Sequence, residues 1–297
     1  MIRSVERQGT ARTADGRTLA FVERGAEDGV PIIVFHGTPG SRYTRHPDPG
    51  LYERHGARMV VYDRPGYGGS DPKPGRSVAD AAADIAAIAD ELGFERFAVV
   101  GGSGGAPHAL ACGALLGDRV LRVGALVTPA PSDTDDFDFF AGLADLNVKE
   151  FGAALEGPEA IDAYLQPFVD EMQRDPDSVI EQISSELPEV DRAIVARPEF
   201  RKIMLESFDE AIRQGVRGWA DDDLAFAKPW GFEPEAVEVE VRLWQGELDV
   251  LAPRSHGEYV ASRLPNARFE LLEGGGHFLD EEWAVVLDWL SAATGVM

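Results

Sequence analysis

One serine of the chain lies within a run of small residues, Gly101-Gly102-Ser103-Gly104-Gly105, that fits the pattern G-x-S-x-G. The apolar stretch 97–100 comes directly before this run, and a stretch with helical spacing, 106–116, follows it at once. A strand, a tight turn and a helix in that order can present a serine hydroxyl at the turn, if the residues two positions away are small. The pattern therefore predicts that Ser103 is a nucleophile for acyl transfer. A phosphate-binding loop is disfavoured, because no Lys-Ser or Lys-Thr follows the glycines.

A serine nucleophile needs a base, and His277 is the best placed of the six histidines. It follows the last apolar stretch, 268–272, in the flexible run Gly274-Gly275-Gly276-His277. Catalytic groups gather at the carboxyl ends of strands in open parallel sheets, which is where this loop is expected to lie. We therefore expect His277 to be the general base. The remaining histidines fall in the first quarter of the chain or on predicted helices, at positions 36, 46, 55, 108 and 256.

The base in turn needs a carboxylate that orients it, and two candidates follow the apolar stretch 239–244. Glu247 and Asp249 both stand in its exit loop, after the turn residue Gly246. We expect Asp249 to be the acid, because it lies deeper in the loop, and Glu247 to be a solvated turn residue. The chain order serine, aspartate, histidine is then the one found in hydrolases with a strand–turn–helix serine.

An oxyanion in the transition state needs two backbone N–H donors. One is expected from Gly104, directly after the nucleophile, and the other from the loop that follows the stretch 31–35. In that loop, His36-Gly37-Thr38-Pro39-Gly40, we expect Thr38 to be the donor, because Pro39 has no N–H group. His36 is expected to pack the loop rather than to take part in the chemistry.

The elements that must position these residues alternate between strands and helices. Apolar, β-branched stretches predict strands at 17–24, 31–35, 57–62, 97–100, 121–128, 239–244 and 268–272. Helical spacing predicts helices at 77–92 with a stop at Gly93, at 106–116, at 254–263 and from about 280. Apolar strands that alternate with helices are typical of an α/β protein with a mostly parallel, twisted sheet covered by helices on both faces.

The alternation is interrupted between 132 and 230, where the sequence is acidic and helical in period. This segment has 24 Asp and Glu against 9 Lys and Arg, and so carries −15 of the net charge of −24. We expect a helical cap at 132–230, inserted between two parts of one core, 1–131 and 231–297. Trp219, Phe226 and Trp230 near its end could line a pocket, although packing is the commoner role of such aromatics. The charge is most simply a solvated face, or else it attracts cationic substrates.

The overall composition narrows the classes of partner. A net charge of −24 disfavours binding to nucleic acid or to an anionic membrane surface. No run of about eighteen apolar residues predicts a membrane span, and the first residues do not resemble a signal peptide. A single cysteine, Cys112, allows no intrachain disulfide. We expect a cytoplasmic protein, a monomer or homodimer, that acts on a small molecule.

Taken in order, five motifs of the chain resemble those of the α/β-hydrolase superfamily with a helical cap. They are HGTPG at 36–40, DRPGYGGSD at 63–71, GGSGG at 101–105, GELD at 246–249 and GGGH at 274–277. The resemblance implies a Ser103–His277–Asp249 triad, no metal and no cofactor. A serine nucleophile separates the chain from haloalkane dehalogenases and epoxide hydrolases, which have aspartate there. Proline iminopeptidases are also similar, but they typically have glycine at the position of Thr38 and tryptophan at that of Gly104.

These features together predict a serine hydrolase that cleaves a carboxylic ester, lactone or thioester through an acyl-enzyme. One alternative is an aminopeptidase of the proline iminopeptidase type, in which the acidic cap would pair with the ammonium group of the substrate. Another is a lyase, cyclase or binding protein that keeps the fold without hydrolysing anything.

Overall fold

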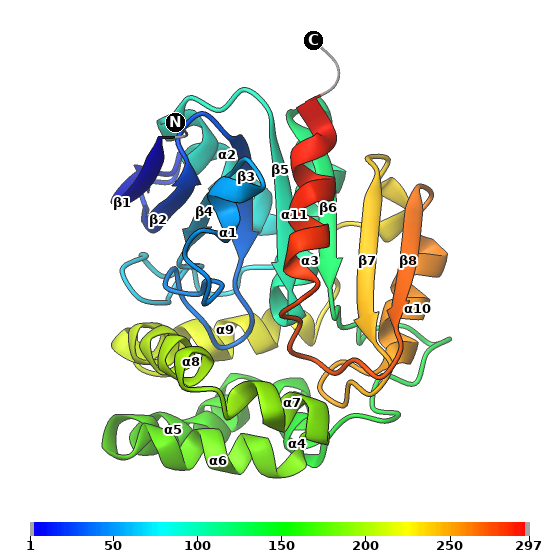
Figure 1. Cartoon of the computed structure of the whole chain (residues 1–297). Coiled ribbons are helices and arrows are strands. Elements are labelled where there is room, and N and C mark those ends of the chain that lie inside the picture. Colours follow the sequence, from blue (N-terminus) through cyan, green and yellow to red (C-terminus); the bar gives the residue numbers. More distant parts are fainter. Residues whose placement is uncertain (1–2, 295–297) are drawn as a thin grey trace.

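An eight-stranded sheet forms the centre of the computed structural model, which describes residues 3–294 (Figure 1). The strand order is β1-β2-β4-β3-β5-β6-β7-β8. Strand β2 runs antiparallel to β1 and β4, and the other neighbours are parallel. The strands are β1 (Ser4–Arg12), β2 (Thr18–Ala26), β3 (Val30–Phe35), β4 (Ala57–Tyr62), β5 (Phe97–Gly102), β6 (Val120–Leu126), β7 (Val241–Gly246) and β8 (Ala267–Leu272). The mostly parallel sheet that the sequence predicts is confirmed.

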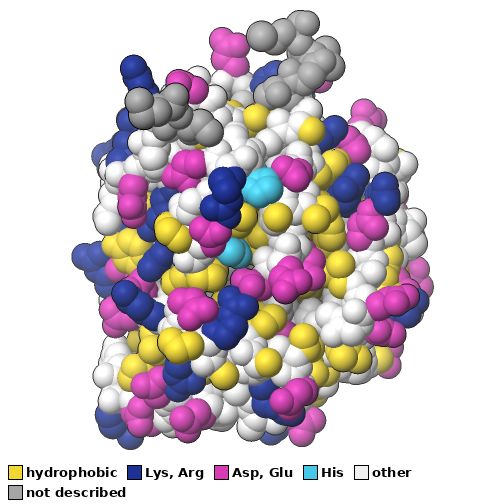
Figure 2. Space-filling view, in the orientation of Figure 1, with side chains coloured by type: hydrophobic (Ala, Val, Ile, Leu, Met, Phe, Trp, Pro, Cys, Tyr) yellow, Lys and Arg dark blue, Asp and Glu magenta, His cyan; other side chains and the backbone are white. Residues whose placement is uncertain are grey.

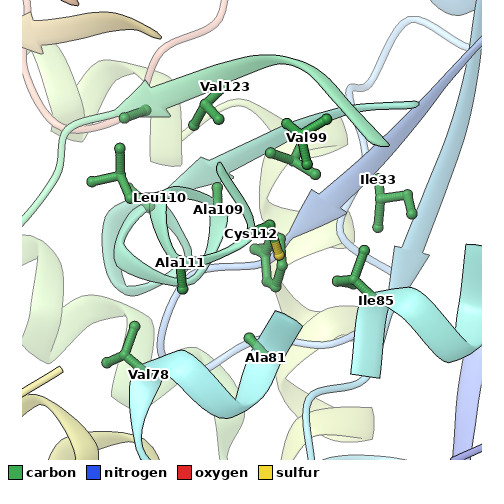
Figure 3. Packing of buried hydrophobic residues seen from close by; sticks show 14 of the residues in the cluster. Ile33, Val78, Ala81, Ile85, Val99, Ala109, Leu110, Ala111, Cys112 and Val123 are labelled. Carbon is green, nitrogen blue, oxygen red and sulfur yellow. The ribbon is translucent and has the colours of Figure 1, made fainter. Parts of the chain in front are cut away.

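Both faces of the central strands are buried, which explains why their sequences are apolar throughout. Side chains alternate between the faces, so Ile33 and Phe35 of β3 pack into one cluster and Ile32 and Val34 into another. The first cluster contains residues of α2 (Ala81–Leu92), α3 (Ala106–Leu115) and α10 (Arg254–Arg263). The second contains residues of the short α1 (Leu51–Arg54) and of α11 (Trp283–Ser291). Figure 3 shows α3 and α2 packed on the strands through Leu110, Ala109 and Ile85.

The predicted elements are present, and their bounds differ by a few residues. Helix α2 ends at Gly93, whose φ of 70° closes the helix in the left-handed conformation. The strand predicted at 97–100 continues to Gly102 and so delivers the chain to the serine turn. Strand β1 was not predicted: it is an edge strand whose mostly exposed, polar sequence lacks the apolar signal.

Six helices between β6 and β7 form what we call the helical insert, residues 145–226. They are α4 (Asp145–Glu156), α5 (Pro158–Arg174), α6 (Pro176–Glu186), α7 (Glu189–Val195), α8 (Pro198–Ala211) and α9 (Arg217–Phe226). Figure 1 shows these helices gathered beyond the carboxyl ends of the parallel strands. No strand occurs between residues 132 and 230, all of which the structure describes. None of the helices within residues 3–294 is long and apolar enough to cross a membrane.

Many acidic residues of the insert are paired with arginines, so its negative charge is not one uninterrupted field. Acidic and basic side chains are interspersed on the face seen in Figure 2. Pairs on the surface include Asp177 with Arg201 and Glu189 with Arg192. Asp222 instead forms a fully buried pair with Arg64 of the core.

Candidate active site

Ser103 stands at a strained turn between β5 and α3. Its φ of 54° is positive, a conformation that non-glycine residues rarely adopt. The turn is tight enough that a side chain at Gly101 would overlap the carbonyl group of Gly105. A side chain at Gly105 would overlap the carbonyl group of Phe35 at the end of β3. The small residues of the G-x-S-x-G pattern are therefore needed where the turn packs against itself and against β3.

His277 and Asp249 are hydrogen-bonded to each other. The Nδ1 atom of His277 lies 2.8 Å from Oδ2 and 3.0 Å from Oδ1 of Asp249. Asp249 is fixed in turn by the backbone N–H groups of Leu251 and Ala252, at 2.8 and 3.0 Å from its Oδ1. Because Nδ1 donates to a carboxylate, Nε2 of the neutral imidazole is the nitrogen that can accept a proton. Residues Ser103 and His277 line the same cavity.

The pKa of His277 reflects this environment. Burial lowers the pKa of the imidazole, but the charge and the hydrogen bond of Asp249 oppose that effect. The charge of Asp191, a residue of the insert, acts in the same direction as Asp249. Together the carboxylates outweigh burial, and the pKa of His277 is raised above its ordinary value.

The competing candidates from the sequence occupy other positions. Glu247 is exposed, and its Oε2 accepts a hydrogen bond of 2.9 Å from the backbone of Gly274 rather than from His277. His46 and His55 contact Asp280 and Asp288. His256 is buried on α10, where its Nδ1 accepts a hydrogen bond of 3.0 Å from the backbone N–H of Ala130. Within residues 3–294 no group of three or more His, Cys, Asp or Glu side chains is placed to hold a metal ion.

Thr38 and Gly104, the predicted oxyanion donors, face each other beside Ser103. A Cβ atom at Gly104 would lie only 2.9 Å from the Thr38 Cβ, and both residues line the cavity. His108 of α3 fixes the Gly104 carbonyl through a hydrogen bond of 2.9 Å from Nδ1. Burial lowers the pKa of His108 to about 3, so this imidazole is neutral at ordinary pH.

His36 packs the loop, as the sequence predicts. Its Nδ1 donates to the Gly37 carbonyl at 2.7 Å, and its Nε2 accepts from the Arg64 backbone N–H at 3.3 Å. Burial and then the charge of Arg64 hold the pKa of His36 well below its ordinary value. Both ring nitrogens are therefore occupied by the backbone of the site, and none is left for substrate.

The guanidinium of Arg64, which sequence analysis did not identify, holds the loop that contains Thr38. It donates to the His36 carbonyl, to the Gly37 carbonyl at 3.1 Å and to the Thr38 Oγ1 at 2.8 Å. Its charge is matched by Asp222 of α9, which also accepts a hydrogen bond of 3.0 Å from the Thr38 hydroxyl. Arg64 and Asp222 are both completely buried.

Asp222 has two further partners in addition to Arg64 and Thr38, and the neutral ring of His108 lies nearby. Tyr67 donates to its Oδ2 at 2.8 Å, Arg76 pairs with its Oδ1, and His108 lies 3.8 Å from the same oxygen. Burial would raise the pKa of Asp222, but Arg64 and Arg76 outweigh it and hold that pKa well below its ordinary value. In the sequence, Arg64 lies in the motif DRPGYGGSD at 63–71, and Asp222 is one of three successive aspartates of the acidic segment 132–230.

A cavity of about 320 Å³ lies between the carboxyl ends of the strands and the insert. Ser103, His277 and Thr38 line it from the core. The insert contributes mainly apolar walls, among them Phe151, Phe168, Met204, Trp219 and Phe226. Trp230, the third aromatic considered from the sequence, packs in the core cluster that includes α3 instead. The insert also contributes polar residues to the wall, including Glu150 and Asp223.

We predict that Asp222→Asn destabilises the protein by about 3–5 kcal/mol, because it leaves the buried charge of Arg64 without its carboxylate. The matched control is Asp177→Asn, which removes a partly exposed Asp–Arg pair of the same insert and should cost about 1 kcal/mol or less. Urea denaturation of the two variants measures both values. Equal losses of stability would show that the buried pair contributes no more to the free energy of unfolding than the surface pair does.

Two relatives are similar to this chain over part of its length. A non-heme chloroperoxidase from Streptomyces lividans is 34% identical over 98 residues, which are 33% of this chain and 36% of that protein. A proline iminopeptidase from Xanthomonas citri is 35% identical over 111 residues, 35% of this chain and 34% of that protein. The matches thus span about a third of the length of these relatives.

A solved structure extends the likeness to nearly the whole chain. A thermophilic esterase from Thermogutta terrifontis matches with a TM-score of 0.68 at 21% identity, over 97% of this chain and 99% of that one. At this identity the likeness shows the fold. Residues 30–158, which include the loop of Thr38 and the Ser103 turn, match the family described as alpha/beta hydrolase fold. This match, the strand order and the likeness to the solved structure show that the chain has the α/β-hydrolase fold.

Proposed function

We propose that the protein is a serine hydrolase that cleaves a carboxylic ester, lactones and thioesters included. The observation that carries this proposal is the placement of three features at one cavity. These are Ser103 at a strained turn, the hydrogen-bonded pair His277–Asp249, and the Thr38–Gly104 corner. A nucleophile, an oriented base and backbone donors are the components that acyl transfer needs.

In the proposed mechanism, the Nε2 atom of His277 takes the proton of Ser103 while Oγ attacks the carbonyl carbon of the substrate. The backbone N–H groups of Thr38 and Gly104 donate to the oxyanion that forms. His277 then gives its proton to the leaving alcohol or thiol, and an acyl-enzyme remains. Water, deprotonated by His277, releases the acid and restores Ser103.

The cavity favours a substrate of moderate size. Its volume of about 320 Å³ is at the lower end of the usual range for small-molecule sites, roughly 300–1,000 Å³. Aromatic side chains of the insert, including Phe151 and Phe168, form much of its wall. A medium-sized apolar acyl or alcohol group would bury its surface there.

We predict turnover of p-nitrophenyl esters of short to medium chain length and covalent labelling of Ser103 by a fluorophosphonate. Ser103→Ala should abolish both, because the probe requires an activated hydroxyl beside an oxyanion site. Ser185→Ala, at an exposed serine of the insert, is the control and should behave as wild type. Mass spectrometry locates the label. Labelling of Ser103→Ala at the wild-type rate would disprove the assignment, and labelling without turnover of any ester would favour a non-hydrolytic activity.

We further predict that Asp249→Asn lowers kcat by on the order of 10⁴-fold, the loss known when a triad aspartate is replaced and the imidazole is held in the wrong tautomer. Glu247→Gln is the matched control two positions away. It should cost little, because Glu247 is exposed and bonds only the backbone of Gly274. Steady-state kinetics with a chromogenic ester compares them. The reverse pattern would move the acid to Glu247.

A second candidate function, removal of an N-terminal residue from a peptide, is favoured by one feature of the cavity wall. Glu150 and Asp223 are buried acids that line it, and Oδ2 of Asp223 has no hydrogen-bond partner. The Trp219 indole donates to Glu150 at 2.6 Å. Burial and then the neighbouring Glu150 raise the pKa of Asp223 well above its ordinary value. These two carboxyl groups would offer a substrate ammonium group an acidic partner in an otherwise apolar wall.

The two candidates are separated by comparing prolyl-naphthylamide with a neutral ester. If the protein is an aminopeptidase, Glu150→Gln should lower kcat/KM for the prolyl substrate by roughly 10- to 10²-fold. This is the loss expected when a hydrogen bond to a charged group, which contributes about 1.5–3 kcal/mol, is removed. The neutral ester should respond much less. Absence of prolyl turnover by the wild-type protein, with normal turnover of esters, would eliminate the second candidate.

A further inference from the structure

We propose that Asp191 of the helical insert is a positioning residue for the base, His277. This inference rests on the proposed function, because it takes His277 as the group that accepts the proton of Ser103. Asp191 lies on α7, whereas His277 lies in the loop after β8, so the contact crosses from the insert to the core. Asp191 would hold the loop that contains His277, which we call the base loop, and would stabilise the protonated imidazole of His277.

Both carboxyl oxygens of Asp191 are used to hold this loop. The backbone N–H of His277 donates to Oδ2 at 2.9 Å, and that of Phe278 donates to Oδ1 at 2.9 Å. Two bonds to adjacent peptides define both the position and the direction of the loop backbone. Asp191 is completely buried, so water does not compete for these donors. The backbone of the base is thereby fixed by the insert, while Asp249 fixes its ring.

The residue before His277 is small for the same reason. A Cβ atom at Gly276 would overlap the carboxyl group of Asp191. The carboxyl group therefore lies directly against the loop backbone at this position. The sequence predicted only a flexible loop for the run Gly274-Gly275-Gly276. At Gly276 the loop backbone lies so close to the Asp191 carboxyl group that only glycine fits.

The charge of Asp191 is directed at His277 and not at a cation. Among residues 3–294, no Arg or Lys forms an ion pair with it. The charged groups that act on His277 are Asp249, in the loop after β7, and Asp191, on α7. Both favour the imidazolium, which forms transiently when Ser103 gives up its proton. Asp191 is thus placed to lower the activation barrier for proton transfer from Ser103, because it stabilises the imidazolium of His277. It does so without contacting the substrate.

The test is the pH profile of kcat/KM for a p-nitrophenyl ester in Asp191→Asn. Without the negative charge the imidazolium is less favoured, so the acid limb should move to lower pH. The plateau should fall by on the order of 10²-fold, the cost of misplacing a catalytic group by about 1 Å. A residue that only supports the fold would lower the plateau without moving the limb downward. NMR titration of the His277 imidazole, identified by comparison with His277→Gln, follows the same shift without relying on turnover.

Two further variants complete the experiment. Glu189→Gln removes an exposed acid of the same helix and should leave both the limb and the plateau as in wild type. Gly276→Ala approaches the contact from the core, and its kcat should fall because the added methyl group displaces the loop from Asp191. If circular dichroism shows that Asp191→Asn does not fold, Gly276→Ala still tests the contact between Asp191 and the loop.

The outcomes distinguish this inference from the proposed function. A wild-type protein that turns over esters, with Asp191→Asn at an unshifted acid limb and Gly276→Ala within twofold of wild-type kcat, would overturn the role of Asp191 alone. A wild-type protein in which Ser103 neither labels nor turns over any ester would overturn the proposed function. The NMR titration would still report whether Asp191 acts on His277.

Discussion

The arrangement of the cavity depends on how the buried charge of Arg64 is matched. Burying a guanidinium away from water costs several kcal/mol of free energy, unless a carboxylate pairs with it in good geometry. Asp222 supplies that carboxylate, and the remaining donors of Arg64 bond the loop that contains Thr38. Because Asp222 lies on α9, the same charge pair fixes the insert against the core. The loop that contains Thr38 and the wall of the cavity are therefore positioned by one interaction.

A second carboxylate of the insert meets the other half of the site. Asp191 holds the backbone of the loop that contains His277, as Asp222 holds the loop of Thr38 through Arg64. The acidic composition of the insert is thus not only a property of its surface. Most of its acids face solvent or pair with arginines there, whereas these two are completely buried against the core. The insert covers the cavity and also takes part in ordering the residues beneath it.

The sequence predicted those parts of the fold and site whose signals are local. Ser103 is marked by five adjacent small residues between a strand and a helix, and Asp249 and His277 by loops after apolar strands. The partnership of Arg64 with Asp222 spans 158 residues, and no local pattern indicates that the three successive aspartates are buried or which of them pairs with Arg64. Asp191 stands in a polar stretch for which the sequence predicted only a helix. Strand β1 was missed because an edge strand does not need apolar alternation.

The two departures from the proline iminopeptidase pattern, Thr38 and Gly104, explain each other in this structure. A Cβ at Gly104 would lie 2.9 Å from the Thr38 Cβ and 3.1 Å from the ring of Phe226. Thr38 cannot turn away without losing its hydrogen bonds to Arg64 and Asp222. A large residue at 104 would therefore need a residue smaller than threonine at 38. In this chain the larger side chain of the two is Thr38, and position 104 is glycine. Thr38 and Phe226 therefore shape the corner of the cavity beside Ser103, and the hydrogen bond from the buried Arg64 fixes Thr38 there.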